Sequence, residues 1–285
     1  MNPATLNQLT PHVYWLPPDE TTDRPILGVV TGERGSLLVD AGNSPAHANL
    51  RLNEIARLRL TAPHYLTLTH WHWDHVFGTA AIQLPTLAHI ETKRIVTEMA
   101  HLDWSDEALD QRVAAGQEIE FCRDMIKAEL PDRRGLVIRP PEIGFTAEVE
   151  LDLGGTTAHL IHVGGDHAAD SIIVYVPGDR LVFLSDCLGP DLYHQPQRYT
   201  AAGSAAMLDR LLSYEAEIYL TGHGDRPLAR AEVVAFADLL RTVGRVVTGH
   251  EKNRPAILTQ LEQTLPAPLD EDVPEIVNAF LAGLQ

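Results

Sequence analysis

The chain is poor in basic residues and in cysteine. Its 285 residues include 22 lysines and arginines against 39 aspartates and glutamates, a formal net charge of −17 with histidine counted as neutral. Nucleic acids and anionic membranes are bound through basic surfaces, so this balance argues against both as the main partner. The only cysteines, Cys122 and Cys187, do not suggest a disulfide framework.

Long apolar runs are also missing. No stretch is long enough to span a bilayer, and the first residues, MNPATLNQLTPHVYWLPP, lack the basic start and apolar run of a signal peptide. We therefore expect a cytoplasmic protein that acts on a small-molecule substrate, with no nucleic acid or membrane as partner. The sequence does not indicate an oligomeric state.

Two β-rich parts are recognisable. HVYWL, ILGVVT and GSLLVDAG read as strands, and a helix is expected after Ser44, with Pro45 in its first turn. Further strands are expected in AEVELDLGG, TAHLIHVGG, SIIVYVPGDRLVFLSD and AEIYLTGHG, where VPGDR is typical of a hairpin turn. This order predicts two β-sheets packed face to face with helices outside.

Two other stretches are helical in pattern. Residues from about 91 to 130 are charged, and Ser105 followed by Asp106 and Glu107 is a good helix start. We interpret this stretch as a helical insertion between the two β-rich parts. The chain from about 228 to 285 is also expected to form helices.

Residues 67–78, TLTHWHWDHVFG, carry the strongest functional signal. His70, His72, Asp74 and His75 are crowded together directly after the strand HYLTLT. Imidazoles and carboxylates are costly to bury without partners, and together they suit Zn²⁺ and related divalent ions. The first two histidines can point the same way from a strand end, and the other two residues would lie on the next turn. Two metals sharing this loop is the easier geometry, and it needs further ligands.

Further candidate ligands occur where later strands give way to loops. His167 lies in HVGGDHAADS, Asp186 ends the apolar strand RLVFLSD, and His223 lies in YLTGHGD between two glycines that permit close approach of the backbone. With the first four residues, these make more ligands than one tetrahedral ion needs. We expect two metal ions per chain, zinc rather than iron or manganese.

At this point the sequence resembles a known family. HWHWDH matches the H-x-H-x-D-H signature of the metallo-β-lactamase superfamily, and the other candidate residues follow in the order of its further motifs, over roughly residues 12–225. The resemblance implies a four-layer αββα sandwich of the α/β (α+β) class. It also implies a single domain, 1–285, with a dinuclear metal site at the edge of the sandwich.

The resemblance assigns a role to each of these residues. His70, His72 and His167 would hold the first metal, and Asp74, His75 and His223 would hold the second. Asp186 would bridge both metals. Asp40, in the turn before Gly42, would orient a histidine ligand, with a turn-forming role alone as the alternative.

The sequence departs from the family pattern in places. Ser185 stands where Gly often precedes the bridging Asp, and His162 and His167 are five residues apart where four is common. Cys187 directly follows Asp186, and some β-lactamases of the family use a cysteine ligand near this position. A ligand role for Cys187 is therefore an alternative to the bridging role of Asp186.

Hydrolysis is the expected reaction, because such metal ions activate water for attack on a carbonyl or phosphoryl centre, with Asp74 placed to orient the nucleophile. The ligand set is similar to that of glyoxalase II and acyl-homoserine lactonases, so an ester, lactone or thioester is the expected substrate. The alternatives are a phosphodiesterase, a β-lactamase-like hydrolase and a non-catalytic metal-binding scaffold. Tyr193 and His194 are candidate substrate contacts. The insertion and the C-terminal helices should cover the mouth of the site.

Overall fold

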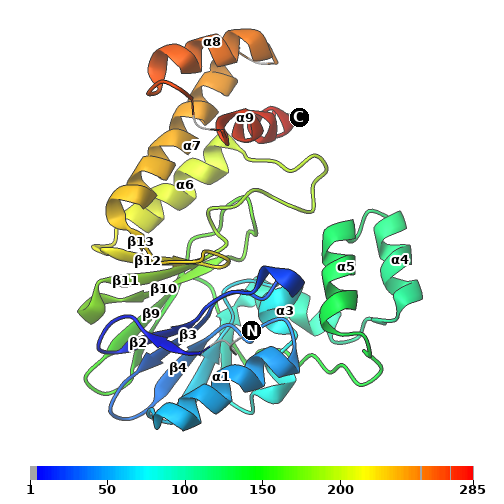
Figure 1. The fold of residues 1–285 in the computed structure, drawn as a ribbon, viewed down its shortest axis with the longest axis vertical. Coiled ribbons are helices and arrows are strands. Elements are labelled where there is room, and N and C mark those ends of the chain that lie inside the picture. The colour runs from blue at the N-terminus through cyan, green and yellow to red at the C-terminus, as the bar shows by residue number, and fades with distance from the viewer. Residues whose placement is uncertain (1–4, 251, 270, 285) are drawn as a thin grey trace.

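Two β-sheets form the centre of the molecule. The computed structural model describes residues 5–250, 252–269 and 271–284. The first sheet has the order β1-β2-β3-β4-β5-β6-β7, and the second has the order β13-β12-β11-β10-β9-β8 (Figure 1). Within the described residues, no helix combines the length and the apolar character needed to cross a bilayer.

The strands of the first sheet are β1 (Asn7–Gln8), β2 (Val13–Leu16), β3 (Leu27–Thr31), β4 (Ser36–Val39), β5 (Pro63–Thr67), β6 (Thr86–His89) and β7 (Ile143–Phe145). Those of the second sheet are β8 (Glu148–Asp152), β9 (Thr157–His162), β10 (Ile172–Val176), β11 (Leu181–Ser185), β12 (Ile218–Thr221) and β13 (Leu228–Ala229). The helices are α1 (Pro45–Leu58), α2 (Trp73–Val76), α3 (Ile90–Met99), α4 (Asp106–Ala114), α5 (Glu120–Glu129), α6 (Ala201–Leu212), α7 (Arg230–His250), α8 (Arg254–Thr264) and α9 (Val273–Ala282). Short 3₁₀ turns occur at Glu20–Thr22, Thr79–Ala81 and Pro177–Asp179.

Alternation along the strands creates the layers. In β4, Leu37 and Val39 join an apolar cluster between the two sheets, while Leu38 faces the helices that cover the first sheet. In β11, Phe183 points between the sheets, and Leu184 packs toward the helices on the far side. Because successive side chains of a strand point to opposite faces, each sheet is apolar on both sides and needs two covering layers. The predicted αββα arrangement is confirmed.

Several local predictions are confirmed as well. The Ser44 hydroxyl accepts a hydrogen bond from the His47 amide at 3.0 Å and starts α1, with Pro45 as its first residue. The Ser105 hydroxyl accepts from the Ala108 amide at 3.3 Å and starts α4. The turn after Val176 joins β10 and β11 as an antiparallel pair.

The helical insertion lies at the predicted residues, as α3, α4 and α5, with strands before and after it along the chain. It does not mark the boundary between the two sheets, because β7 follows it and pairs in parallel with β6 of the first sheet. A parallel neighbour requires a long crossover connection, and the insertion provides it. The C-terminal region likewise begins with the short strand β13, paired antiparallel with β12, before its helices start.

Candidate metal centre

The seven predicted ligands come together at one edge of the sandwich. His70 and His72 lie in the loop after β5, and Asp74 and His75 lie on the short helix α2. The second sheet supplies the remaining three from loops that follow its strands, namely His167 after β9, Asp186 after β11 and His223 after β12. Backbone hydrogen bonds join the two sheets there, from the Ile172 amide to the Thr69 carbonyl at 2.8 Å and from the Ile26 amide to the Gly222 carbonyl at 2.6 Å.

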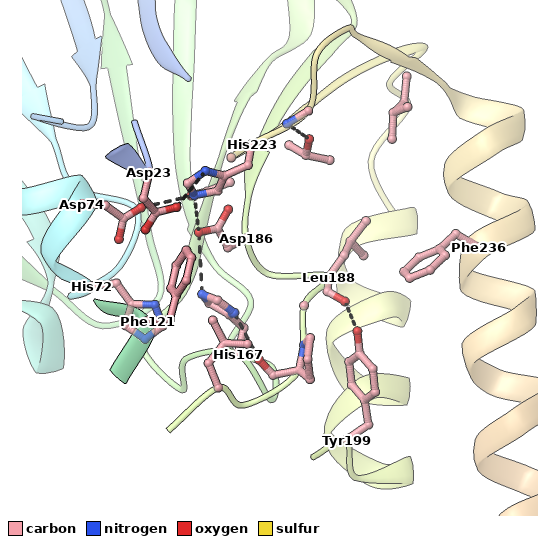
Figure 2. A pocket seen from close by; sticks show the side chains of 18 of the residues that line it. Asp23, His72, Asp74, Phe121, His167, Asp186, Leu188, Tyr199, His223 and Phe236 are labelled. Atoms are coloured by element: carbon pink, nitrogen blue, oxygen red, sulfur yellow. Dashed lines mark hydrogen bonds and ion pairs between the residues drawn. The ribbon is translucent and has the colours of Figure 1, made fainter. Parts of the chain in front are cut away.

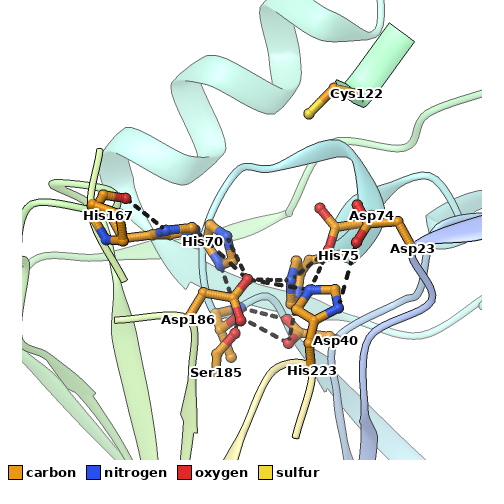
Figure 3. Close-up of polar contacts among 12 residues, drawn as sticks. Asp23, Asp40, His70, Asp74, His75, Cys122, His167, Ser185, Asp186 and His223 are labelled. Atoms are coloured by element: carbon orange, nitrogen blue, oxygen red, sulfur yellow. Dashed lines mark hydrogen bonds and ion pairs between the residues drawn. The ribbon is translucent and has the colours of Figure 1, made fainter. Parts of the chain in front are cut away.

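The ligand atoms form two compact groups within the described residues. In each group the atoms lie within 4.8 Å of one another, and the members are His70, His72 and His167 in the first group and Asp74, His75, Asp186 and His223 in the second. Figure 3 shows the two groups on either side of the Asp186 carboxylate. Asp186 Oδ2 is 3.6 Å from His167 Nε2 and 3.0 Å from His75 Nε2, so one oxygen faces both groups.

The first group consists of buried imidazoles with free inner nitrogens. The Nε2 atoms of His70, His72 and His167 are buried and have no hydrogen-bond partner. Burial lowers the pKa of each of these imidazoles, which keeps the rings neutral. Unpaired buried nitrogens are costly unless something binds them, and neutral imidazoles are good zinc ligands. The residues present therefore fit a metal ion.

The outer nitrogens of two of these rings are held by oxygen atoms. His167 Nδ1 lies 3.2 Å from the carbonyl oxygen of Pro190, and His70 Nδ1 lies 3.2 Å from the hydroxyl of Thr69. A carbonyl can only accept, so the proton of His167 is on Nδ1 and the lone pair is on Nε2. This is the tautomer that a metal ion at Nε2 requires.

The second group is strongly charged. Burial alone would lower the pKa of His75, but the carboxylates of Asp74, Asp40 and Asp186 outweigh it and raise that pKa well above its usual value. The pKa of His223 is raised to about 11, since nearby Asp186 and Asp74 outweigh burial. The same contacts hold the pKa of Asp186 well below its usual value, although its burial acts in the opposite direction.

Asp40 occupies the place expected of a residue that orients a histidine. Its Oδ2 lies 2.9 Å from His75 Nδ1, and its Oδ1 accepts from the Thr69 amide at 2.7 Å. Asp40 has a left-handed backbone, with φ of 61°. Such a conformation is unfavourable for a residue other than glycine, and these hydrogen bonds fix it.

The backbone conformation of Ser185 explains why glycine suits the position before Asp186. Its φ is 50°, again in the left-handed region. The Ser185 hydroxyl lies 2.8 Å from the Thr69 hydroxyl, which itself donates to Asp40 at 2.9 Å. The serine therefore adds a side-chain link between the two sheets that glycine would lack.

Gly222 makes room for the Asp186 carboxylate. A Cβ atom at this position would lie 1.7 Å from Asp186 Oδ1, so even alanine would collide with the carboxylate. The glycines around His223 were expected to let the backbone approach a metal. The structure gives Gly222 a more specific part, the close approach of the next loop to Asp186.

The remaining candidates of the sequence analysis lie in different surroundings. Tyr193 lines the cavity beside the metal ligands, with its ring 5.2 Å from the ring of His72. His194 does not line this cavity, and its Nδ1 lies 2.8 Å from the Pro196 carbonyl oxygen. Cys187 belongs to neither ligand group and is buried among the apolar residues beneath α6 and α7. His162 stacks on His89 away from the centre, with ring centroids 4.0 Å apart.

A cavity of about 630 Å³ opens from the ligand groups. Phe121 and Cys122 of α5 line it, and so do Val233 and Phe236 of α7 (Figure 2). The expectation that the insertion and the C-terminal helices cover the mouth of the site is confirmed by these residues.

Asp23 is a lining residue that the sequence analysis did not identify. Its Oδ1 lies 3.5 Å from His223 Nδ1, and burial, followed by the charge of Asp74, raises its pKa to about 7. No motif marks this aspartate, since it lies in an acidic turn far from the histidine cluster in sequence. Only the fold brings it to the site.

Comparison with known proteins identifies the family. A family model described as the metallo-beta-lactamase superfamily matches residues 27–223. The chain belongs to this superfamily.

Individual relatives are distant. A linear primary-alkylsulfatase from a Pseudomonas species is 21% identical over 235 residues, which cover 72% of this chain and 42% of that protein. The chain thus spans less than half the length of this curated relative.

Solved structures share the fold. The stereoselective inverting sec-alkylsulfatase Pisa1 from Pseudomonas sp. matches with a TM-score of 0.65 and 14% identity, over 98% of this chain and 50% of that chain. A metallo-beta-lactamase from Pontibacter korlensis matches with a TM-score of 0.57 and 17% identity, over 82% of this chain and 97% of that one.

Proposed function

We propose that this chain is a metal-dependent hydrolase with two zinc ions, acting on an uncharged carbonyl substrate such as an ester, lactone or thioester. The observation that carries the proposal is the convergence of the three unpartnered, buried Nε2 atoms of His70, His72 and His167 beside a second group of four ligands. A non-catalytic scaffold would not need a complete ligand set that opens into a large cavity.

The residues of this chain divide the work of the reaction. The three neutral imidazoles would hold one ion, and Asp74, His75 and His223 would hold the other, with Asp186 between them. When bound, two such ions lower the pKa of a water molecule and polarise the substrate oxygen. Asp74 faces the cavity and would orient the attacking water. Asp40 would hold His75 in the required tautomer through Nδ1.

The charge of the cavity favours an uncharged substrate. The described residues that line it include Asp23, Asp74, Asp186 and Glu232 but no lysine or arginine. A sulfate or phosphate group would have only the metal ions to balance its charge, whereas a carbonyl ester brings no charge.

Alkyl sulfate hydrolysis is the second candidate. A linear primary-alkylsulfatase and a sec-alkylsulfatase are among the relatives, and the apolar cavity wall would accommodate an alkyl group. It ranks second because no lysine or arginine is among the described residues that line the cavity.

A substrate panel and a metal analysis test the proposal. Protein purified without chelator should contain two zinc ions per chain and should hydrolyse an aryl ester, a lactone or a thioester. The activity should disappear in His70→Ala. Turnover of alkyl sulfates, phosphodiesters or β-lactams with none on these carbonyl compounds would refute the substrate class. One metal per chain, or iron in place of zinc, would refute the metal assignment.

A further inference from the structure

The cavity has a polar end and an apolar arm. Asp74, Asp186 and His223 lie at the polar end. We call the apolar arm the part of the wall that comes from α5, α7 and the loop after β11, namely Phe121, Cys122, Leu188, Tyr199, Val233 and Phe236. Figure 2 shows Leu188, Tyr199 and Phe236 on the far side from the ligand groups, whereas Phe121 lies toward them. The first three residues extend the cavity away from the candidate metal centre.

The polar atoms of the apolar arm are already paired within the protein. The Tyr199 hydroxyl donates to the Leu188 carbonyl at 2.8 Å, and the Tyr193 hydroxyl lies 3.9 Å from the Cys122 sulfur. Glu232 accepts from the Arg226 guanidinium at 2.7 Å. The arm therefore offers little to a polar ligand, and burying a hydroxyl or a charge there without a partner would be unfavourable.

The size of the cavity also exceeds what a small ester requires. Its volume of about 630 Å³ is typical of a pocket that encloses a ligand with many atoms. Phe121 is 53% exposed although it is a large aromatic residue, and it lines this same cavity. An apolar side chain left accessible at a pocket wall is a place where an apolar ligand gains contact.

We propose that the apolar arm binds an unbranched hydrocarbon chain of the substrate, which makes the substrate an aliphatic ester or thioester of intermediate chain length. This inference rests on the proposed hydrolase function for the placement of the scissile group. The binding of the chain itself depends only on the arm. Each methylene that enters the arm should tighten binding about fourfold until the arm is full.

Two measurements distinguish binding of the hydrocarbon chain in the apolar arm from hydrolysis at the candidate metal centre. The first is titration calorimetry of the protein as purified with 1-butanol, 1-hexanol, 1-octanol and 1-decanol, which probes chain binding without hydrolysis. The second is the kcat/KM of p-nitrophenyl esters from acetate to dodecanoate. Both should rise with chain length and then level off or fall. A series of alkyl sulfates with the same chain lengths shows whether the head group is instead a sulfate.

Substitutions on α7 provide a matched pair. Phe236→Trp should shorten the arm and move the optimum to shorter chains, with at least a tenfold loss for the longest ester and little change for the acetate. Ala235→Trp adds the same ring to the preceding residue of α7, which is exposed and does not line this cavity. This variant should leave the dependence on chain length unchanged. Leu188→Phe, in the loop after β11, should act like Phe236→Trp.

The outcomes are distinguishable. Alcohol binding that strengthens with chain length, with no ester or thioester hydrolysed, would overturn the proposed function and leave the arm's role intact. Ester hydrolysis with a flat dependence on chain length, unchanged by Phe236→Trp and Leu188→Phe, would overturn the inference and leave the proposed function intact.

A separate observation concerns Asp23. Its carboxylate lies 3.5 Å from Nδ1 of His223, while Nε2 of the same ring faces Asp74 at 3.2 Å and Asp186 at 3.6 Å. Asp23 has a left-handed backbone with φ of 57°. The geometry thus repeats at His223 what Asp40 does at His75, a carboxylate on the outer nitrogen and the ligand groups on the inner one.

The turn that carries Asp23 is firmly attached. Glu129 at the end of α5 accepts from the Arg24 guanidinium at 2.8 Å and from the Thr22 hydroxyl at 2.6 Å. The backbones of Asp19 and Arg24 pair across the turn at 2.9 and 3.0 Å. Because the residues on both sides of Asp23 are held in this way, its carboxylate is well placed to fix the orientation of the His223 ring.

We infer that Asp23 is a positioning residue, which acts on the second metal through His223. Asp23→Asn should weaken the second zinc ion about 10- to 100-fold in competition with a chromogenic chelator, with the first ion unchanged. Asp23→Glu should restore part of this affinity. Asp19→Asn, in the same turn, is the control and should bind both ions normally. Equal loss of both ions, or none, would overturn the assignment.

Discussion

The two ligand groups of the candidate metal centre, its two halves, differ in the protonation of their histidines. In the group of His70, His72 and His167, burial lowers every pKa and outweighs the opposing charge of Asp186. In the other group, carboxylates outweigh burial and raise the pKa of His75 and His223. Histidine rings are thus neutral on one side of Asp186 and positively charged on the other.

This contrast indicates how each half would take up a metal ion. The neutral imidazoles have free lone pairs at neutral pH and need release no proton. In the mixed group, an ion must displace protons from His75 and His223, because a ligand nitrogen has to be deprotonated. In return, the ion gains the two carboxylates, whose negative charge attracts it. The first half is ready for metal, and the second exchanges protons for metal.

The largest expected effect comes from removing the residue that joins the halves. Asp186→Ala should lower kcat/KM at least about a thousandfold, since metal ions supply several kcal/mol of transition-state stabilisation and about 1.4 kcal/mol is tenfold. Steady-state kinetics on the ester that the protein hydrolyses would measure this loss. Cys187→Ser is the matched control and should retain most of the activity. A thiolate-to-metal band in the cobalt-substituted protein would instead make Cys187 the ligand.

The second-largest effect is expected on the metal content of variants in the two halves. His75→Ala should lose mainly the second ion and reduce the zinc content from near two to near one per chain. His72→Ala removes one of the three neutral imidazoles and should lose mainly the first ion. Elemental analysis together with cobalt spectra of each variant would reveal which site remains. Identical spectra for the two variants would contradict a division into two groups.

The smallest effect is the pH dependence of stability after treatment with chelator. Lowered folded pKa values in the three-histidine group mean that stability is lost as the pH falls below the unfolded value of 6.5. The pKa of His223 is raised to about 11, so its contribution is complete below 6.5 and is lost as the pH rises toward 11. Urea unfolding should therefore show a maximum of stability near neutral pH.

Single substitutions would sharpen this result. His72→Gln should flatten the acid side of the profile, and His223→Gln should flatten the alkaline side. Each group that titrates contributes a slope of at most about 1.4 kcal/mol per pH unit. A profile in which either substitution changes both sides equally would show that the two halves are not distinct in this way.

What the sequence allowed us to predict depends on how locally each feature is encoded. The first four ligands lie within six residues after a strand, so the local chain alone brings them together. His167, Asp186 and His223 were recognisable because each follows an apolar strand, and strand ends gather at a sheet edge. The order of strands and helices along the chain was sufficient to predict the layers.

Features set by distant parts of the chain escaped prediction. β6 and β7 are short, and their pairing in the first sheet depends on a partner far along the chain, so the return of the chain to the first sheet after the insertion was not predicted. Asp23 carries no motif, and its neighbour His223 lies at the other end of the family match. Phe236 was expected only as part of a covering helix, because helical periodicity does not tell which apolar side chain remains open to a cavity.

The joining of the two sheets at the candidate metal centre also has a consequence for how the chain holds together. In the terms of polymer physics, an ion bound by His72 and His167 is a reversible cross-link that closes a loop containing the whole insertion and the strands on either side of it. Such a link stabilises the folded chain by a free energy that rises with the logarithm of the free ion concentration. Metal supply should therefore govern how readily this edge opens to a protease, and the lifetime of the protein as well as its activity would follow it.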